Sequence, residues 1–323
     1  MSISPPLETS ILGAIGHTPL IELRRIVEQR GLRGRLLAKL EYMNPGGSMK
    51  DRIALQIVRN ARANGALRDG QAVVEFTSGN TGTGLAIVCR ALGHPFVAVM
   101  SKGNSSERAK MMRAFGAEVV LVDQAPGSII GEVSGEDLEL VARRTEELVN
   151  ERNAFRADQF ANPNNSLAHE TGTGEEIWQQ SRGEVDAFVH FAGTGGTFAG
   201  VARCLRRHHP QLRAYLAEPA EARALAGQPV TRSNHKIQGG GYSMSELPLL
   251  DRSLATGFLG VSDAEAIDGA RLLAREEGIF AGFSAGANLS AALQLLAGPE
   301  AGRTIVFLAC DTGMKYLSTD LHA

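Results

Sequence analysis

The chain has 323 residues, of which 43% are hydrophobic and 21% charged, and its formal net charge is −2. This balance is that of an ordinary globular protein, and the length suffices for about two domains. No run of lysine and arginine indicates a nucleic-acid or membrane-surface partner, and no apolar run approaches the ~18 residues of a membrane span. The N-terminal segment MSISPPLETS lacks the pattern of a signal peptide.

The three cysteines, Cys89, Cys204 and Cys310, are scattered and form no Cys-x-x-Cys pair. An odd number of isolated cysteines argues against a disulfide framework and against a thiolate metal site. We therefore expect a cytoplasmic protein that holds no metal.

From residue 36 onward, short apolar runs alternate with helical patterns. In the first half, strands are predicted at 36–42, 71–76, 96–100 and 118–122, and helices from Met49 to about residue 64, from TSGNTG to Leu92, and from Ser105/Ser106 to Gly116. Residues 124–137 interrupt this pattern, and a charged helix over 138–150 follows. In the second half, strands are predicted at 185–191, 213–219 and 304–310, and helices up to His208, over 263–277 and up to Leu296. Such alternation predicts an α/β fold with mostly parallel sheets and helices on both faces.

Four of the strand-to-helix loops are rich in glycine. A helix N-terminus presents unpaired N–H groups and a partial positive charge, so such a loop suits an anion, although these turns often need small residues in any case. The loop GTGGT (193–197) is the best phosphate candidate, because three glycines let backbone N–H groups close on the ligand. It lacks the Lys-Ser/Thr of a nucleotide P-loop and the third glycine of a dinucleotide fingerprint. A phosphate carried by something other than ATP or NAD is implied.

Lys50 is the most unusual single residue. Ser48 is a plausible N-cap with Asp51 three residues later, so Lys50 falls in the first turn of a helix, where the dipole disfavours a cation. That position and the apolar surroundings predict a lowered pKa and a neutral amine, the form that makes a Schiff base. Position alone leaves a solvated surface lysine open as the alternative.

The motif GFSAG (282–286) matches the nucleophile elbow of α/β-hydrolases, which would make Ser284 a nucleophile. That fold needs an acidic residue and then a histidine after the serine, whereas the sole later histidine is His322, the penultimate residue. A hydrolase is therefore a remote alternative, and so is a non-catalytic sensor of a phosphate ligand.

Five motifs become recognisable when they are taken together and in order. They are KLEYMNPGGSMKDR (39–52), FTSGNTGTGLA (76–86), GTGGTFAGV (193–201), HKIQGGG (235–241) and EEGIFAGFSAGAN (276–288). The chain resembles the cysteine synthases and cystathionine β-synthases, a family of pyridoxal-phosphate (PLP) enzymes, from residue 13 to residue 319. The resemblance implies fold type II, the tryptophan-synthase-β type. This fold has two three-layer α/β domains, 41–154 and 1–40 plus 155–323, and PLP in the cleft between them.

The resemblance also implies a role for each matching residue. Lys50 would carry PLP as a Schiff base, Asn80 would bond the phenolic oxygen of the cofactor, and Ser284 would face its pyridine nitrogen. The phosphate would be cradled by Gly193, Thr194, Gly195, Gly196 and Thr197. The substrate carboxylate would be bound by Thr77, Ser78, Gly79 and Thr81, with help from Gln159.

The implied reaction is β-replacement through an α-aminoacrylate, with an O-activated serine and a sulfur nucleophile as substrates. O-acetylserine and sulfide would give cysteine and acetate, with serine or O-phosphoserine as alternative first substrates and homocysteine as an alternative nucleophile. The segment KIQGGGYSM (236–244) departs from the KIQGIGAGF typical of cysteine synthases and is closer to cystathionine β-synthases. The second substrate is therefore expected at Gly239, Gly240, Gly241 and Tyr242. The family also implies a homodimer.

Overall fold

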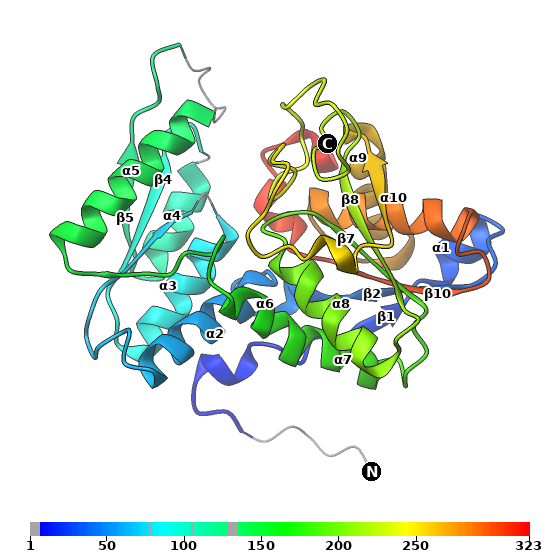
Figure 1. Ribbon diagram of the computed structural model, residues 1–323, viewed down its shortest axis with the longest axis horizontal. Coiled ribbons are helices and arrows are strands. Elements are labelled where there is room, and N and C mark those ends of the chain that lie inside the picture. The colour runs from blue at the N-terminus through cyan, green and yellow to red at the C-terminus, as the bar shows by residue number, and fades with distance from the viewer. Residues whose placement is uncertain (1–6, 78, 105, 128–134) are drawn as a thin grey trace. The chain divides into compact units, whose positions relative to one another are not determined.

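The computed structural model describes residues 7–77, 79–104, 106–127 and 135–323, and Figure 1 traces its elements. The chain divides into two compact units. The first comprises Met1–Gly16, Asn44–Gly46 and Lys50–Asp158, and the second comprises His17–Met43, Gly47–Met49 and Gln159–Ala323. Among the described residues, no helix combines the length and the apolar character needed to cross a membrane.

The first unit is built on a sheet of four parallel strands in the order β5-β4-β3-β6. The strands are β3 (Val73–Phe76), β4 (Phe96–Ser101), β5 (Glu118–Val122) and β6 (Phe155–Arg156). The helices are α2 (Lys50–Ala63), α3 (Asn80–Leu92), α4 (Ser106–Ala114) and α5 (Gly135–Glu151), with a 3₁₀ turn η1 (Ile11–Ala14).

Alternate residues of these strands are buried on opposite faces of the sheet. On one face, Val73 and Ala98 pack with Leu85 of α3 in a cluster that also contains α2 residues. On the other face, Val97 packs with Val141 of α5. Because strand side chains alternate with a period of two, a nearly continuous apolar run supplies both faces. The first unit therefore has three layers, with α5 alone covering the second face among the described helices.

The second unit contains a six-stranded sheet in the order β1-β2-β10-β7-β8-β9, in which only the β1–β2 pair is antiparallel. The strands are β1 (Leu20–Glu22), β2 (Arg35–Lys39), β7 (Ala187–Phe191), β8 (Arg213–Pro219), β9 (Gly257–Val261) and β10 (Thr304–Leu308). The helices are α1 (Arg24–Gln29), α6 (Asn164–Ala168), the π-helical η3 (His169–Gly174), α7 (Glu175–Gln180), α8 (Gly196–His208), α9 (Asp263–Glu277) and α10 (Phe283–Ala297). Short 3₁₀ turns are η2 (Glu41–Met43), η4 (Arg252–Leu254), η5 (Gly313–Tyr316) and η6 (Asp320–His322).

Two layers of helices cover this sheet as well. Leu36 of β2 packs with Leu273 of α9 and Leu289 of α10 on one face. Its neighbour Leu37 packs with Phe198 of α8 on the other face. The α/β class with two three-layer units and mostly parallel sheets is therefore confirmed.

Several boundaries differ from those expected. The run 36–42 ends as a strand at Lys39, because the chain then turns into η2, where Met43 donates its N–H to Leu40. The final strand stops at Leu308 instead of residue 310. The charged helix α5 is longer at both ends than 138–150, while residues 128–134 of the interrupting segment lie outside the described residues. The strands β1, β6 and β9 were not predicted. β1 and β6 have only two or three residues and show no periodicity, and β9 (GFLGV) contains two glycines at the end of a stretch that was expected to be irregular.

Candidate active site

The turn between β7 and α8 carries the predicted phosphate cradle. Gly195, the N-cap of α8, has φ = +84°, in the left-handed region. A β-carbon on Gly195 would also lie 2.8 Å from Cβ of Leu250, so conformation and space both require glycine. The first N–H groups of α8 have no partner within the helix, and the dipole there favours an anion. The turn is therefore suited to a phosphate.

A buried asparagine on α6 supports this turn. Asn165 Nδ2 donates to the hydroxyl of Thr194 at 3.0 Å and to the carbonyl of Gln159 at 2.7 Å. Its Oδ1 has no hydrogen-bond partner among the described residues and would lie 2.4 Å from a β-carbon on Gly196. Asn165 thus joins the buried Gln159 to the cradle. Sequence reasoning missed it, because a lone asparagine in a helical segment belongs to none of the motifs.

The predicted second-substrate loop packs directly on the cradle. The N–H of Gly241 donates to the carbonyl of Ala192 at 2.8 Å. A β-carbon on Gly240 would lie 2.3 Å from the same oxygen, and one on Gly193 would lie 3.2 Å from the carbonyl oxygen of Gly239. Gly240 and Gly193 therefore allow two stretches of backbone to meet. The structure brings this loop and the turn after β7 together.

Tyr242 follows these glycines and is 44% exposed. Its ring meets Phe160, the residue after Gln159, edge to face with centroids 5.5 Å apart. Tyr242 also lines a small hollow together with Gly193 and the buried Glu218. The Glu218 carboxylate accepts two backbone N–H groups, at 2.7 and 3.0 Å, while burial raises its pKa. Tyr242 is thus open to a ligand on one side and packed on the other.

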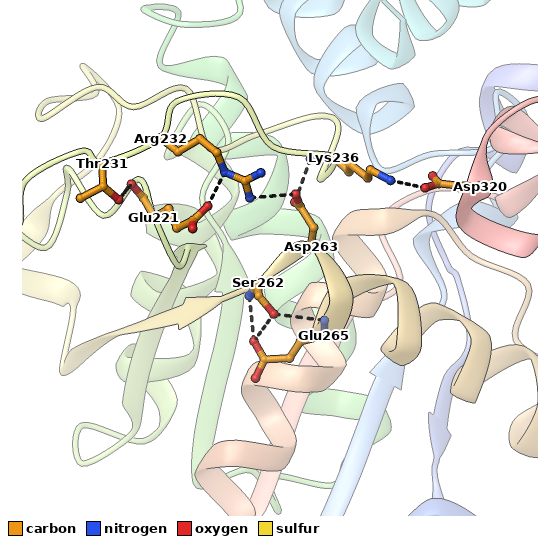
Figure 2. Close-up of polar contacts among 8 residues, drawn as sticks. All are labelled: Glu221, Thr231, Arg232, Lys236, Ser262, Asp263, Glu265 and Asp320. Atoms are coloured by element: carbon orange, nitrogen blue, oxygen red, sulfur yellow. Dashed lines mark hydrogen bonds and ion pairs between the residues drawn. The ribbon is translucent and has the colours of Figure 1, made fainter.

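A group of charged residues anchors the segment that leads to this loop (Figure 2). Arg232 pairs with Glu221 and with Asp263, the first residue of α9. Asp263 also accepts the backbone N–H of Lys236 at 2.8 Å, and the Lys236 ammonium pairs with Asp320. The chain is therefore fixed at two points shortly before Gly239.

In the first unit, Lys50 is the first residue of α2 and is 8% exposed. Gly84 of α3 packs against it, since a β-carbon there would lie 3.0 Å from the carbonyl oxygen of Lys50 and 3.1 Å from Cα of Asp51. The Asp51 carboxylate accepts the N–H of Gly46 at 2.5 Å. α2 begins at Lys50, so Met49 and not the predicted cap Ser48 occupies the position before the helix, while Lys50 lies in the first turn as predicted. Close helix packing fixes the backbone of the lysine.

The loop between β3 and α3 is shaped by Thr77. The buried Thr77 hydroxyl accepts the N–H of Gly79 at 3.3 Å and that of Gly82 at 2.9 Å. Gly82 has no room for a side chain, because a β-carbon would lie 2.6 Å from Cγ2 of Thr77 and 2.4 Å from Sδ of Met112. The two hydrogen bonds of Thr77 therefore stabilise the conformation of the loop.

The other residues predicted in this loop lie at the start of α3. Asn80 and Thr81 are its first two residues, and Gly79 is its N-cap. The partial positive charge at the start of a helix is suited to a carboxylate, although the N–H of Gly79 already donates to Thr77. Ser78, the remaining residue of the set, lies outside the described residues.

Met49 precedes Lys50 in the chain but belongs to the second unit. Its N–H donates to the carbonyl of Cys310 at 2.9 Å, and its sulfur lies 4.0 Å from the hydroxyl of Thr197. The residue adjacent to the predicted Schiff-base lysine therefore contacts the predicted cradle. Sequence reasoning missed this contact, because the two residues are 148 positions apart.

Ser284 is the second residue of α10 and is half-buried. His322, which a hydrolase would need as its base, has Nε2 3.2 Å from the carbonyl oxygen of Ala281, so this nitrogen is a donor. Its ring packs on Phe280 at 4.2 Å between centroids, and burial lowers its pKa. The Nε2 of His322 is therefore directed at a backbone carbonyl and not at Ser284.

The protein has two three-layer α/β units. One carries a glycine turn suited to a phosphate, and the other carries a buried lysine at a helix start. This combination is that of the PLP-binding α/β enzymes. The model of the family described as "Pyridoxal-phosphate dependent enzyme" matches residues 11–311. The chain belongs to this family.

Relatives with known names agree with this assignment. Over 317 residues, 97% of each chain, the protein is 38% identical to a cysteine synthase of Staphylococcus aureus. The structure of an O-ureido-L-serine synthase is similar with a TM-score of 0.87 and 41% identity, covering 98% of this chain and 95% of the other. An O-acetyl serine sulfhydrylase of Entamoeba histolytica is similar with a TM-score of 0.90 and 34% identity, covering 100% and 94%.

The residues of the turn fit the phosphate of PLP. Backbone N–H groups can approach the ligand closely because glycine occupies positions where a β-carbon would meet Leu250, Asn165 or Gly239. Asn165 positions the turn through the bond from its Nδ2 to Thr194, and its Oδ1 accepts none of the backbone N–H groups of the turn, which are left for the anion. The side chain of Lys50 ends in the kind of amine with which the aldehyde of PLP forms a Schiff base.

Proposed function

We propose that this protein catalyses β-replacement on an O-activated serine, with O-acetylserine and sulfide giving cysteine and acetate. The observation that carries the proposal is the glycine turn after β7, on which the loop 239–241 packs and which the neighbour of Lys50 contacts. Near-full-length similarity to a cysteine synthase and to an O-acetyl serine sulfhydrylase supports the same reaction.

Each group of residues has a separate task in this proposal. The N–H groups from Gly193 to Thr197 hold the phosphate, and Lys50 Nζ holds the cofactor and later takes the proton from Cα of the substrate. The first turn of α3 binds the substrate carboxylate through Asn80, Thr81 and their neighbours. PLP, when bound, supplies the electron sink that makes loss of that proton possible. Orientation by the protein lowers the barrier, because both partners are held in reacting geometry.

Asn80 and Ser284 tune the cofactor in this scheme. Asn80 is the first residue of α3 and Ser284 is the second residue of α10, so the helices fix their backbones. Both side chains are half-buried. Asn80 would donate to the phenolic oxygen, and Ser284 would face the pyridine nitrogen with a neutral hydroxyl. A neutral partner adjusts the electron demand of the ring without a full charge.

A larger sulfur nucleophile, such as homocysteine, is the second candidate. It is favoured by Tyr242, whose half-exposed ring presents an aromatic face and a hydroxyl beside the cradle. The similarity to an O-ureido-L-serine synthase shows that a relative at 41% identity makes a different product. We therefore expect the loop that carries Tyr242 to determine which nucleophile the enzyme accepts.

Product analysis separates these candidates. Purified enzyme is given O-acetylserine, O-phosphoserine or serine, each with sulfide and with homocysteine, and the amino-acid product is quantified. We expect cysteine from O-acetylserine and sulfide to form fastest. Cystathionine as the main product would favour the second candidate, and no amino-acid product from any pair would refute β-replacement.

We also propose a cytoplasmic homodimer. Three buried cysteines, which form no disulfide within the described part of the chain, are compatible with a reducing compartment. Light scattering that gives twice the chain mass of 34.3 kDa would support the dimer, and a monomer would contradict it.

A further inference from the structure

A cluster of three possible metal ligands lies where α7 meets the end of α8. Cys204 and His208 are four residues apart on α8, so their side chains lie on one face of the helix. Glu175 is the first residue of α7. Sγ of Cys204, a ring nitrogen of His208 and a carboxylate oxygen of Glu175 all lie within 4.8 Å of one another. Nothing in the proposed reaction uses these residues.

Packing holds two of the three groups in place. The Cys204 thiol is buried against the backbone of Gly174, where a β-carbon would lie 2.8 Å from Sγ. The His208 ring is stacked on Trp178, with centroids 4.9 Å apart and planes 9° from parallel. Its Nε2 lies 2.9 Å from Oε2 of Glu175. The donor atoms are therefore directed toward one another by the fold.

The charges of the cluster are consistent with a divalent cation. Glu175 also pairs with Arg207 at 3.1 Å, but Arg207 has a second and shorter pair with Glu170 at 2.7 Å. If Glu175 turned to a metal, Arg207 would keep its pair with Glu170, a carboxylate that Arg203 also contacts at 3.0 Å. A thiolate and a carboxylate would balance a divalent ion, and the C-terminal end of α8 is the end at which the helix dipole favours a cation.

We propose that Glu175, Cys204 and His208 bind Zn²⁺, with solvent as the fourth ligand. Sulfur, nitrogen and oxygen are the ligands that zinc prefers, and bonds of about 2.0–2.3 Å in a tetrahedral site place donors about 3.5 Å apart. The three donors already lie within 4.8 Å of one another, so zinc binding requires shifts of only about 1 Å from the packed positions. The site would join α7 to the end of the helix that begins at the phosphate cradle.

Zinc binding would release one proton, because a thiol binds zinc as the thiolate. The S–H bond breaks, an S–Zn bond forms, and the proton passes to solvent.

The test measures zinc on the PLP-loaded enzyme. Chelator-treated protein is titrated with Zn²⁺ in competition with a chromophoric chelator, and bound metal is counted by elemental analysis. We expect one zinc per chain, a tenfold or greater loss of affinity in Cys204→Ser and in His208→Gln, and wild-type affinity in the controls Cys89→Ser and His209→Gln.

Two readouts keep the result unambiguous. Cys204 is buried, so near-ultraviolet circular dichroism and the visible absorbance of bound PLP verify that Cys204→Ser is folded. His208→Gln changes a partly exposed side chain and tests the site independently. No zinc on the wild type, or equal affinity in wild type and His208→Gln, would overturn the proposal.

Discussion

Gly195→Ala would place a methyl group in the most constrained part of the proposed cradle. Its φ of +84° is left-handed, which costs a residue with a side chain about 1–2 kcal/mol. The new β-carbon would also lie 2.8 Å from Cβ of Leu250, and overpacking of this kind costs about 1–3 kcal/mol. The two effects add to about 2–5 kcal/mol. At ~1.4 kcal/mol per tenfold, that would weaken PLP binding by about 30-fold or more.

The assay reconstitutes metal-free apoenzyme with PLP and follows the visible absorbance of the bound cofactor. Thermal unfolding without PLP shows how much of the cost destabilises the fold instead. Gly302→Ala is the matched control, because Gly302 has φ of +82° and no atom within 4 Å of an added β-carbon. Gly302→Ala should lower the free energy of unfolding by the conformational cost alone, and its affinity for PLP should not change. If Gly195→Ala binds PLP as wild type does and unfolds like Gly302→Ala, the cradle lies elsewhere.

Three further predictions concern the reaction and the stability of the fold. Ser284→Ala should slow turnover several-fold without abolishing it, because a neutral hydroxyl only tunes the ring, and an esterase activity lost in this variant would restore the hydrolase alternative. Tyr242→Ala should change the ratio of rates with sulfide and homocysteine while release of acetate in the first half-reaction stays nearly constant, and an unchanged ratio would make Tyr242 structural. Hydrogen bonds from Arg152 lower the pKa of Glu118, so this pair should stabilise the fold at neutral pH and lose its effect as the pH falls through the folded pKa. Both side chains are partly exposed, so Arg152→Gln should cost no more than about 1 kcal/mol at neutral pH. The loss of stability in Arg152→Gln should vanish in acid, where Glu118 is protonated. A loss of stability that grew as the pH fell would contradict this prediction.

The sequence predicted the fold class because the apolar runs and glycine-closed helices report it locally. α3 ends at Gly93 with φ of +80°, and α9 ends at Gly278 with φ of +68°, as C-terminal glycines do. The strands 118–122 and 213–219 were predicted to the residue. Short elements such as β1 and β6 exist because neighbouring strands pair with them, which no local pattern records.

The contacts that assemble each half of the site depend on long-range packing. Asn165 reaches Thr194 across 29 positions, and Gly84 of α3 packs on the backbone of Lys50. The cluster of Glu175, Cys204 and His208 was hidden for the same reason, because isolated cysteines indicated no metal site. Sequence motifs predicted the reacting groups, whereas the residues that pack against these groups could be recognised only from the structure.

The most direct test of the central claim is where PLP is attached. Purified enzyme is treated with borohydride, which fixes the cofactor to the amine that holds it, and is then digested and mapped by mass spectrometry. We expect one modified peptide, with the label on Lys50. A label on another lysine, or no label on protein that contains PLP, would contradict it.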